Sequence, residues 1–588
     1  MKQLINISFV LLLGLSVTTT YGQDKLKVYG AGRFIIQNGL ASGDLYEGGV
    51  FSGDTLAADT VNPGREMRGT ALFDLGFQLN PNPNTEIRVL TRVTSDLDGF
   101  WGEGIGFGFR ELYVRGLIKG KVRYRVGDLD LQMTPFTLYN YDADLGSHRL
   151  SSLHVFEDIV QYEQFYRDNR WRQQGVSTDF KLRLPGKGNS LGFEGFIAKN
   201  RQTDFFFLSD RLLSGGTMTY GKSGLGEFSY NIISMFDVAQ TAQFSEASSA
   251  NTVHTLAAKV QPLEELPLVF YGEGGLSTNT YEEITNAPTD TNDVFFQLGV
   301  RKVNDPKLQY YAEFIHVGAG FRSPGAQSRR INPNALPLNF SYQGNQEFQR
   351  GITAFDLLLD PGVYNRTITP GLQPFLPAYN NITPYGTATP NRQGLNLGVE
   401  LHNDSSVLNM LAVHTNLLTE VSGEGIDQYR NFLGARVNAR LALNELWEGE
   451  KDIMFELNGS FQNTSRDALE TSVAELEGIG DVSLTSSFVE AGISVELAED
   501  LHFNAGTLML MAEGNEYMAM RDAFSLVEDF TEVTYDFNDQ TLFGGFKYSF
   551  NQNTQLLMQY RRSNITQNLV EGTDYSIDQV TVLFNLFF

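Results

Sequence analysis

The sequence predicts an all-β protein, a transmembrane antiparallel up-and-down β-barrel of about 22 strands (18–22). Three observations lead to this fold class. Apolar and polar residues alternate along many segments, as in strands whose two faces have different surroundings. Clusters of Gly, Asn, Asp and Pro divide these segments into hairpins. Hydrophobic residues make up only 41% of the chain, and no run approaches the roughly 18 apolar residues of a spanning helix.

The C-terminal segment, residues 576–588, shows the alternation most clearly. One face is apolar and ends in an aromatic residue at the C-terminus: Val580, Val582, Phe584, Leu586 and Phe588. The other face carries Gln579, Thr581, Leu583, Asn585 and Phe587. This strand resembles the closing strand of Gram-negative outer-membrane β-barrels of the porin type. The resemblance implies that Phe584, Leu586 and Phe588 form the C-terminal signal read by the barrel-insertion machinery.

Short turns and long connections alternate along the chain. Residues 67–79 and 85–94, for example, form two alternating segments joined by Asn80-Pro81-Asn82-Pro83-Asn84. The longest predicted connections are 131–173 and 322–391, and others include 38–65, 278–292 and 515–538. In outer-membrane barrels the turns are periplasmic and the long loops extracellular. An even number of strands then leaves both termini in the periplasm.

The N-terminus reads as an export signal. Lys2 precedes an apolar run over residues 4–15, and Thr20-Tyr21-Gly22 follows it. We expect a signal peptide at residues 1–22, and a single barrel domain over residues 23–588. The signal and Gln23 resemble those of Bacteroidota envelope proteins. The expected location is therefore the cell outer membrane, in contact with lipid and lipopolysaccharide.

Composition excludes several classes of function. The chain has no Cys, so thiolate metal sites and cysteine nucleophiles are excluded. Its formal net charge of −25 argues against nucleic-acid binding, which needs phosphate-neutralising Lys and Arg. The seven His are scattered, and no Ser, His and Asp set is recognisable. We therefore expect no cofactor, no metal centre and no enzymatic activity.

The inward faces of the early strands carry a group of cations that we name the basic wall: Arg88, Arg92, Arg115, Arg123, Arg125, Lys181 and Arg183. Arg167, Arg170 and Arg172 follow in the connection 131–173. The basic wall could attract anionic solutes, as rings of charge do in pores. Alternatively, these cations pair with carboxylates such as Glu86 and Glu111, or with folded-in loops, and only stiffen the wall.

Later strands provide an acidic side of the lumen, formed by Glu456, Glu490 and Glu496. Arg436 and Arg440 face Glu456 across one hairpin. Opposed walls of this kind could create a transverse field, or the paired charges could neutralise one another.

The two longest connections are expected to shape the lumen. A barrel of about 22 strands is wide, since diameter grows with strand number. We predict that 131–173, 322–391 or both fold inward as a constriction. The alternative is an outer dome, or a docking surface for an envelope protein on 322–391. The predicted function is a porin-like channel for passive diffusion of small polar or anionic solutes. The alternative is a structural or accessory barrel in a larger envelope complex for secretion, assembly or uptake.

Overall fold

The computed structural model describes residues 26–43, 45–52, 55–61, 65–96, 105–141, 150–163, 169–186, 188–244, 247–261, 267–283, 286–303, 305, 307–329, 367–373, 375–403, 406–423, 428–446, 449–470, 479–521, 527–568 and 573–588. The predicted signal peptide, residues 1–22, lies outside the described residues. No helix in the described ranges has the length and apolar character needed to cross a membrane.

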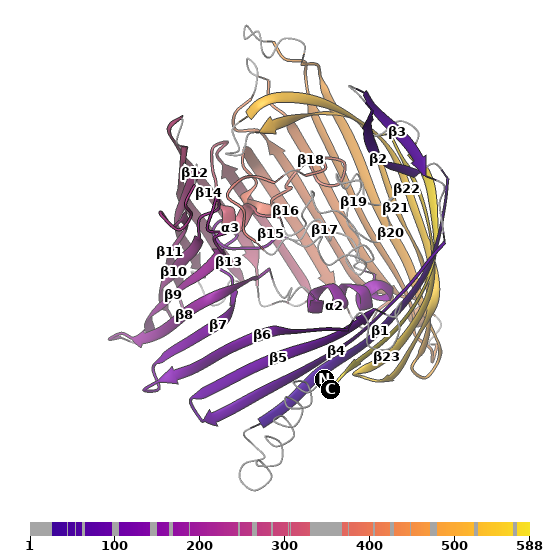
Figure 1. The fold of residues 1–588 in the computed structure, drawn as a ribbon, viewed down its shortest axis with the longest axis horizontal. Helices are drawn as coiled ribbons and strands as arrows, with labels where there is room; N and C mark the ends of the chain where they lie inside the picture. Colours follow the sequence, from indigo (N-terminus) through magenta and orange to yellow (C-terminus); the bar gives the residue numbers. More distant parts are fainter. Residues whose placement is uncertain are drawn as a thin grey trace.

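Twenty-two strands form one antiparallel sheet that closes into a barrel (Figure 1). Closure comes from β1, which pairs with β24 on one side and β4 on the other. The predicted fold class and strand number are thus confirmed. The strands of the barrel are β1 (Leu26–Gly43), β4 (Arg65–Asn82), β5 (Thr85–Asp96), β6 (Ile105–Ile118), β7 (Val122–Leu131), β8 (Trp171–Arg183), β9 (Asn189–Arg201), β10 (Arg211–Lys222), β11 (Gly226–Asp237), β12 (Ala247–Val260), β13 (Leu268–Glu283), β14 (Asn286–Lys302), β15 (Leu308–Val317), β16 (Arg392–His402), β17 (Leu408–Thr419), β18 (Asn431–Ala442), β19 (Ile453–Arg466), β20 (Val482–Ala498), β21 (Leu501–Arg521), β22 (Val527–Asn551), β23 (Thr554–Gln567) and β24 (Thr573–Phe587).

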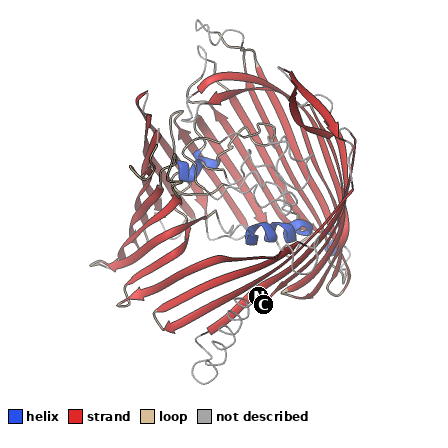
Figure 2. Ribbon diagram, viewed as in Figure 1, coloured by secondary structure: helices blue, strands red, loops and turns tan. Residues whose placement is uncertain are grey.

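The remaining elements are small. β2 (Leu45–Ser52) and β3 (Thr55–Val61) form a separate two-stranded sheet. The helical segments are η2 (Ser151–Leu153), α2 (His154–Glu163), α3 (Pro324–Gln327), η4 (Gly386–Ala388) and η5 (Leu443–Leu446). Figure 2 shows the helices drawn in blue surrounded by strands. We call the end of the barrel with the short turns the turn end, and the opposite end the loop end.

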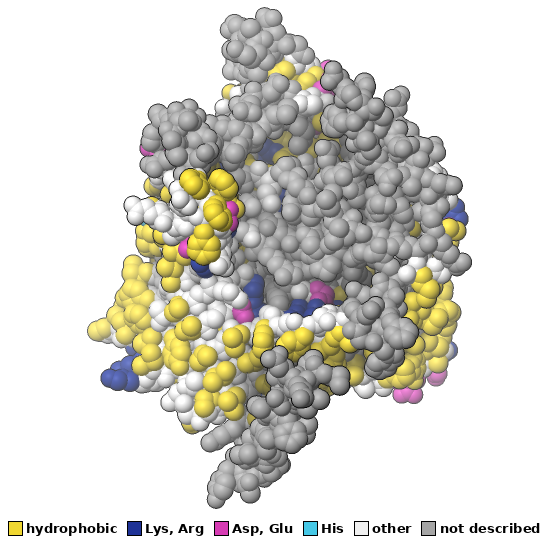
Figure 3. Space-filling view, in the orientation of Figure 1, with side chains coloured by type: hydrophobic (Ala, Val, Ile, Leu, Met, Phe, Trp, Pro, Cys, Tyr) yellow, Lys and Arg dark blue, Asp and Glu magenta, His cyan; other side chains and the backbone are white. Residues whose placement is uncertain are grey.

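The two faces of the strands differ as the alternation predicts. On the last three strands Phe546, Met558 and Val580 point outward and are 44–50% exposed. Their neighbours Gln559 and Thr581 point inward and are buried. The outside of the barrel is therefore an exposed apolar surface, parts of which appear in yellow in Figure 3.

Several strands are longer than the sequence predicts. The expected connections 38–65, 278–292 and 515–538 are largely strand, because β1 continues to Gly43, β13 and β14 almost meet, and β21 and β22 extend as a long hairpin. Those loop predictions were wrong. A strand end that meets water on both faces needs no apolar alternation, although its backbone ladder continues.

Candidate lumen constriction

Parts of both long connections lie inside the barrel. The first infolded segment comprises the described residues 132–141 and 150–163, including η2 and α2. The second infolded segment comprises the described residues 318–329 and 367–391, including α3 and η4. Figure 1 shows α2 and α3 within the ring of strands. The sequence predicted that one or both connections fold inward, and the described parts of both do so.

An apolar cluster holds the two infolded segments together near the loop end. Phe136 of the first segment stacks on Phe295 of β14, with ring centroids 3.9 Å apart. The hydroxyl of Ser323 donates to the carbonyl of Phe136 at 2.7 Å, which ties the second segment to the first. The cluster is completed by inward residues of β9 to β15, among them Ala198, Leu213, Ile233, Val253 and Ile315. The inward faces of these strands are therefore apolar at this height, because the infolded segments cover them.

The second infolded segment crosses the lumen. At one end, the side-chain amide of Asn200 on β9 donates to the carbonyl of Ile368 at 2.7 Å and accepts from its N–H at 3.0 Å. At the other end, Ala378 packs in an apolar cluster with Leu484, Leu510 and other residues of β20 to β22. β9 and β21 lie on nearly opposite sides of the ring. The segment therefore spans the barrel.

The first infolded segment makes a second crossing. The Ser151 hydroxyl donates to Glu456 of β19 at 2.7 Å, so one end of the η2–α2 unit is fixed to the late strands. At the other end, Tyr162 and Glu163 contact β1, β4, β5 and β6. Together the two crossings narrow the lumen, as the constriction prediction proposed.

The contacts at the end of α2 form a buried ionic cluster, which we call the Asp74 cluster. The Asp74 carboxylate is fully buried and accepts from Arg92 at 2.6 and 2.7 Å, from Arg110 at 2.7 Å and from the Tyr162 hydroxyl at 2.6 Å. Glu163 pairs with Arg33 and Arg92, and lies 3.9 Å from Arg110. Among the described residues of this cluster, three guanidinium groups thus meet two carboxylates, an excess of one positive charge.

The titration of Glu163 reflects these partners. Burial alone would raise the pKa of its carboxyl, but the hydrogen bond from Arg92 and the charges of Arg33 and Arg92 lower the pKa below its ordinary value. For Tyr162, burial and the hydrogen bond to Asp74 raise the pKa of the phenol. At neutral pH Glu163 is therefore charged and Tyr162 is a donor, which is the arrangement that holds α2 to the wall.

A pH dependence of the α2 contact follows. A carboxyl with a lowered folded-state pKa stabilises the fold above its ordinary pKa, and this contribution is lost as the pH falls through the lowered value. Amides of α2 should therefore keep constant hydrogen-exchange protection, corrected for intrinsic rates, down to about pH 4.3, and lose protection only below it. Glu163→Gln should already show reduced protection at neutral pH. A loss of protection in the wild type near pH 6 would contradict this assignment.

The basic wall divides into two parts. Toward the loop end its cations are paired and partly buried. Arg92 belongs to the Asp74 cluster, Arg88 lies 3.1 Å from Glu111, and Arg125 lies 3.8 Å from Glu111 and 3.3 Å from Asp130. Arg172, at the start of β8, joins them at 2.9 Å from Glu111. Arg167 lies outside the described residues.

Toward the turn end the cations of the basic wall are exposed. Arg115 pairs with Glu86 at 2.8 Å and Arg123 with Asp179 at 2.6 Å, yet their side chains are 53% and 73% exposed. Lys181 and Arg183 continue this face of β8 and are exposed as well. The pairing with Glu86 and Glu111 that the sequence suggested is present, but it leaves the turn-end cations open to water.

The predicted acidic side is mostly engaged in contacts. Glu456 is buried and pairs with Arg440 at 2.8 Å, whereas Arg436 lies opposite Ser460 in the strand register. Glu490 is buried and accepts from Asn458 at 3.0 Å. Glu496 accepts from the backbone N–H of Asp452 at 3.2 Å, near the turn end.

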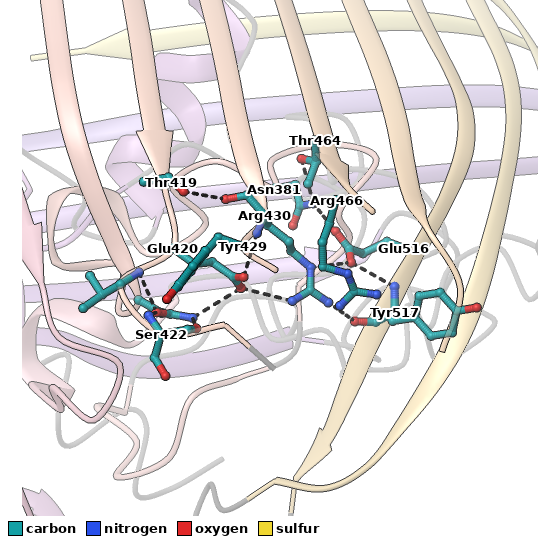
Figure 4. Close-up of polar contacts among 12 residues, drawn as sticks. Asn381, Thr419, Glu420, Ser422, Tyr429, Arg430, Thr464, Arg466, Glu516 and Tyr517 are labelled. Atoms are coloured by element: carbon teal, nitrogen blue, oxygen red, sulfur yellow. Dashed lines mark hydrogen bonds and ion pairs between the residues drawn. The ribbon is translucent and has the colours of Figure 1, made fainter. Parts of the chain in front are cut away.

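A second buried ionic cluster, the Arg430 cluster, anchors the second infolded segment (Figure 4). Arg430 bridges Glu420 at 3.0 Å and Glu516 at 2.9 Å, and all three side chains are buried. Glu516 also accepts from the Asn381 side chain at 2.7 Å. Because Asn381 belongs to the infolded segment, this cluster fixes the crossing to β21.

Sequence reasoning missed Arg33, Asp74, Arg110 and Glu163. Asp74 and Arg33 have the inward parity of their strands, and a carboxylate beside the cation-rich strand 85–96 was a usable signal. Strict alternation along β6 would place Arg110 on the outward face. A register shift between Leu90 and Thr91 changes which residues of β6 point inward, so the sequence pattern could not identify Arg110. Glu163 reaches the cluster only through the path of the infolded chain.

Comparisons with known proteins give likenesses of architecture. No family model and no curated protein matches the chain. Among solved structures, a BenF-like porin from Pseudomonas fluorescens Pf-5 is 8% identical, with a TM-score of 0.34 over 96% of this chain and 99% of that one. OpdQ of Pseudomonas aeruginosa is 8% identical, with a TM-score of 0.30 over 95% and 98%. The FrpB iron transporter of Neisseria meningitidis is 8% identical, with a TM-score of 0.44 over 96% and 82%.

Proposed function

We propose that this protein is an outer-membrane channel through which small polar or anionic solutes diffuse passively. The observation that carries the proposal is the closed 22-stranded ring with an exposed apolar outer face and charged inner walls. A closed ring of strands satisfies nearly all of its backbone hydrogen-bonding groups within the sheet, which is what a hydrocarbon environment demands. An apolar surface of this extent would be unfavourable in water.

The exposed cations at the turn end support the preference for anions. Arg115, Arg123, Lys181 and Arg183 line one side of the lumen below the infolded segments. Cationic rings favour anion entry in pores. With the short turns in the periplasm, these residues would lie at the periplasmic mouth, and both termini would be periplasmic.

The terminal strand supports insertion through its C-terminus. The backbone N–H of Phe588 donates to the Gly30 carbonyl at 3.1 Å, and its ring stacks on Phe73 at 5.8 Å. We keep Phe584, Leu586 and Phe588 as the proposed signal for the insertion machinery. Contact with lipid and lipopolysaccharide, and an origin in a Bacteroidota envelope, are part of the same proposal.

Ion selectivity in a planar bilayer tests the function. The double variant Arg123→Glu, Lys181→Glu should shift the reversal potential in a salt gradient toward cations, because two negative charges replace two positive ones on the lumen wall. Arg562→Glu is the control for a charge reversal outside the lumen, since Arg562 is exposed on the outward face of β23 and lies 3.8 Å from Asp578. Equal reversal potentials for the two variants would reject the role of the turn-end cations.

The second candidate is an accessory barrel of an envelope complex. The apolar cluster that fills part of the loop end favours it, because such packing could seal the lumen. Purified protein that inserts into the bilayer but gives no conductance steps would support this candidate over the channel. Envelope proteins captured through residues 322–391 would then be the partners to identify.

A further inference from the structure

The barrel wall separates locally between β6 and β7. β6 pairs with β5 along residues 85–95 of β5. It pairs with β7 only along Tyr113–Ile118 of β6. The other side of residues 105–112 has no ladder partner among the described residues. β7 continues to Leu131, but beyond Gly127 it pairs only with β8. Figure 1 shows β6 diverging from the β7–β8 pair.

The cause is an inward bend of the β7–β8 hairpin. Gly127 and Gly175 face each other in the register, and Gly127 has a φ of +106°. A Cβ would come within 2.3 Å of the Leu112 carbonyl oxygen at Gly127, and within 2.1 Å of the Ile197 carbonyl oxygen at Gly175. Beyond these glycines β8 also leaves β9, because their pairing starts at Gln174. The tips of the hairpin carry Leu129 and Trp171 into the lumen cluster.

The height of the separation places it in one half of a membrane. The six residues of β6 that pair with β7, at about 3.3 Å each and a tilt of about 40°, rise about 15 Å, whereas the apolar band of such barrels is about 25 Å tall. The unpaired part of β6 thus begins near mid-height and continues toward the loop end. If the long loops are extracellular, it faces the outer leaflet.

The two sides of this opening differ in chemistry. Ile105, Phe107 and Phe109 project outward from β6 and are 56–70% exposed. On the lumen side lie the guanidinium groups of Arg110 and Arg172. The N–H of Leu112, which the ladder leaves open, donates to the Asp128 carboxylate at 2.6 Å. Figure 3 shows basic and acidic side chains in a hollow above a row of apolar ones.

Behind the opening, the Asp74 cluster keeps an excess positive charge. Arg33 is 1% exposed, and its Nε and Nη2 atoms have no hydrogen-bond partner among the described residues. Buried donors of this kind require an acceptor. A carboxylate head group would supply one, and a hydrocarbon tail would suit the aromatic outer rim.

We propose that the separation between β6 and β7 is a lateral passage for an amphiphile with an anionic carboxylate head and a long apolar tail, which moves between lumen and bilayer. The inference rests on the proposed location of the barrel in a membrane. It adds a membrane-soluble substrate class to the aqueous solutes of the channel. The inward bend at Gly127 and Gly175 makes the passage a permanent feature of the fold.

The test uses a photoreactive long-chain carboxylate dissolved in the bilayer of phosphatidylcholine vesicles that hold the full-length protein. After irradiation, mass spectrometry should find adducts on Arg125 and Arg172, whose lumen-side side chains are 21% and 17% exposed, as well as on outward-facing Met558. A trimethylammonium probe with the same tail should label Met558 but should spare the lumen. Adducts of the carboxylate on outward-facing residues alone would overturn the proposal.

Two variants make the test specific. No described atom lies within 4 Å of a Cβ built at Gly108, on the lumen side of the unpaired segment, or at Gly459, on the closed wall of β19. Gly108→Trp should fill the passage and abolish lumen adducts, while Gly459→Trp should label as the wild type does. Undiminished lumen labelling in Gly108→Trp would refute the passage. Conductance of the same samples reports on the channel separately, so normal conductance without lumen adducts rejects only the passage.

Discussion

Asp74→Ala is expected to loosen α2 from the wall and to increase the single-channel conductance. Asp74 is fully buried and accepts hydrogen bonds from Arg92, Arg110 and Tyr162. Removing one partner of a buried ionic cluster typically costs about 3–5 kcal/mol, because the remaining charges stay buried without compensation. Part of this cost can be avoided if the end of α2 leaves the wall and water reaches the guanidinium groups.

Asp179→Ala provides the matched control for Asp74→Ala. It also removes the carboxylate of an ion pair with a wall arginine, but Arg123 is 73% exposed. Exposed pairs contribute only about 0–1 kcal/mol. We therefore expect urea unfolding and conductance close to those of the wild type. If both alanine variants unfold at the same urea concentration, the Asp74 cluster does not secure the first infolded segment.

The barrel could be predicted from sequence because the patterns that specify strands and turns are local in the sequence. Alternation along a strand such as 576–588 follows from the two environments of its faces, and Gly, Asn and Pro clusters mark the turns. The strand number and the faces of Phe546, Met558 and Val580 therefore came out correctly. The extended tips of β13, β14, β21 and β22 did not, since a strand in water on both faces has no alternation to detect.

The candidate site depends on contacts that sequence patterns do not encode. Arg92 was assigned to the lumen, but its partner Glu163 lies 71 residues further along, at the end of an infolded helix. The path of that chain decides whether Arg92 is open to solutes or neutralised. For Arg123 and Lys181 no such segment arrives among the described residues, and their side chains are exposed. The alternation along a strand therefore predicts which face of the barrel a side chain occupies. It does not predict whether an infolded segment covers that side chain.

Arg430→Ala is expected to release the second infolded segment from β21 and to destabilise the protein by about 3–5 kcal/mol. The guanidinium group bridges two buried carboxylates, Glu420 at 3.0 Å and Glu516 at 2.9 Å. Its removal takes away the cation that bridges the two carboxylates. Since Glu516 also holds Asn381, repulsion between the carboxylates should displace the crossing segment as well. Urea unfolding and protease cleavage within residues 375–391 measure the two effects.

The origin of this effect in uncompensated charge can be tested by rescue. Adding Glu420→Gln and Glu516→Gln to Arg430→Ala removes both unpaired charges while it keeps side chains of similar size. This triple variant should regain much of the lost stability, because a neutral buried set avoids the desolvation of isolated ions. Arg562→Ala, whose side chain is 50% exposed, should change stability by no more than about 1 kcal/mol. If the triple variant is less stable than Arg430→Ala, the packing of the arginine stem rather than its charge anchors the crossing segment.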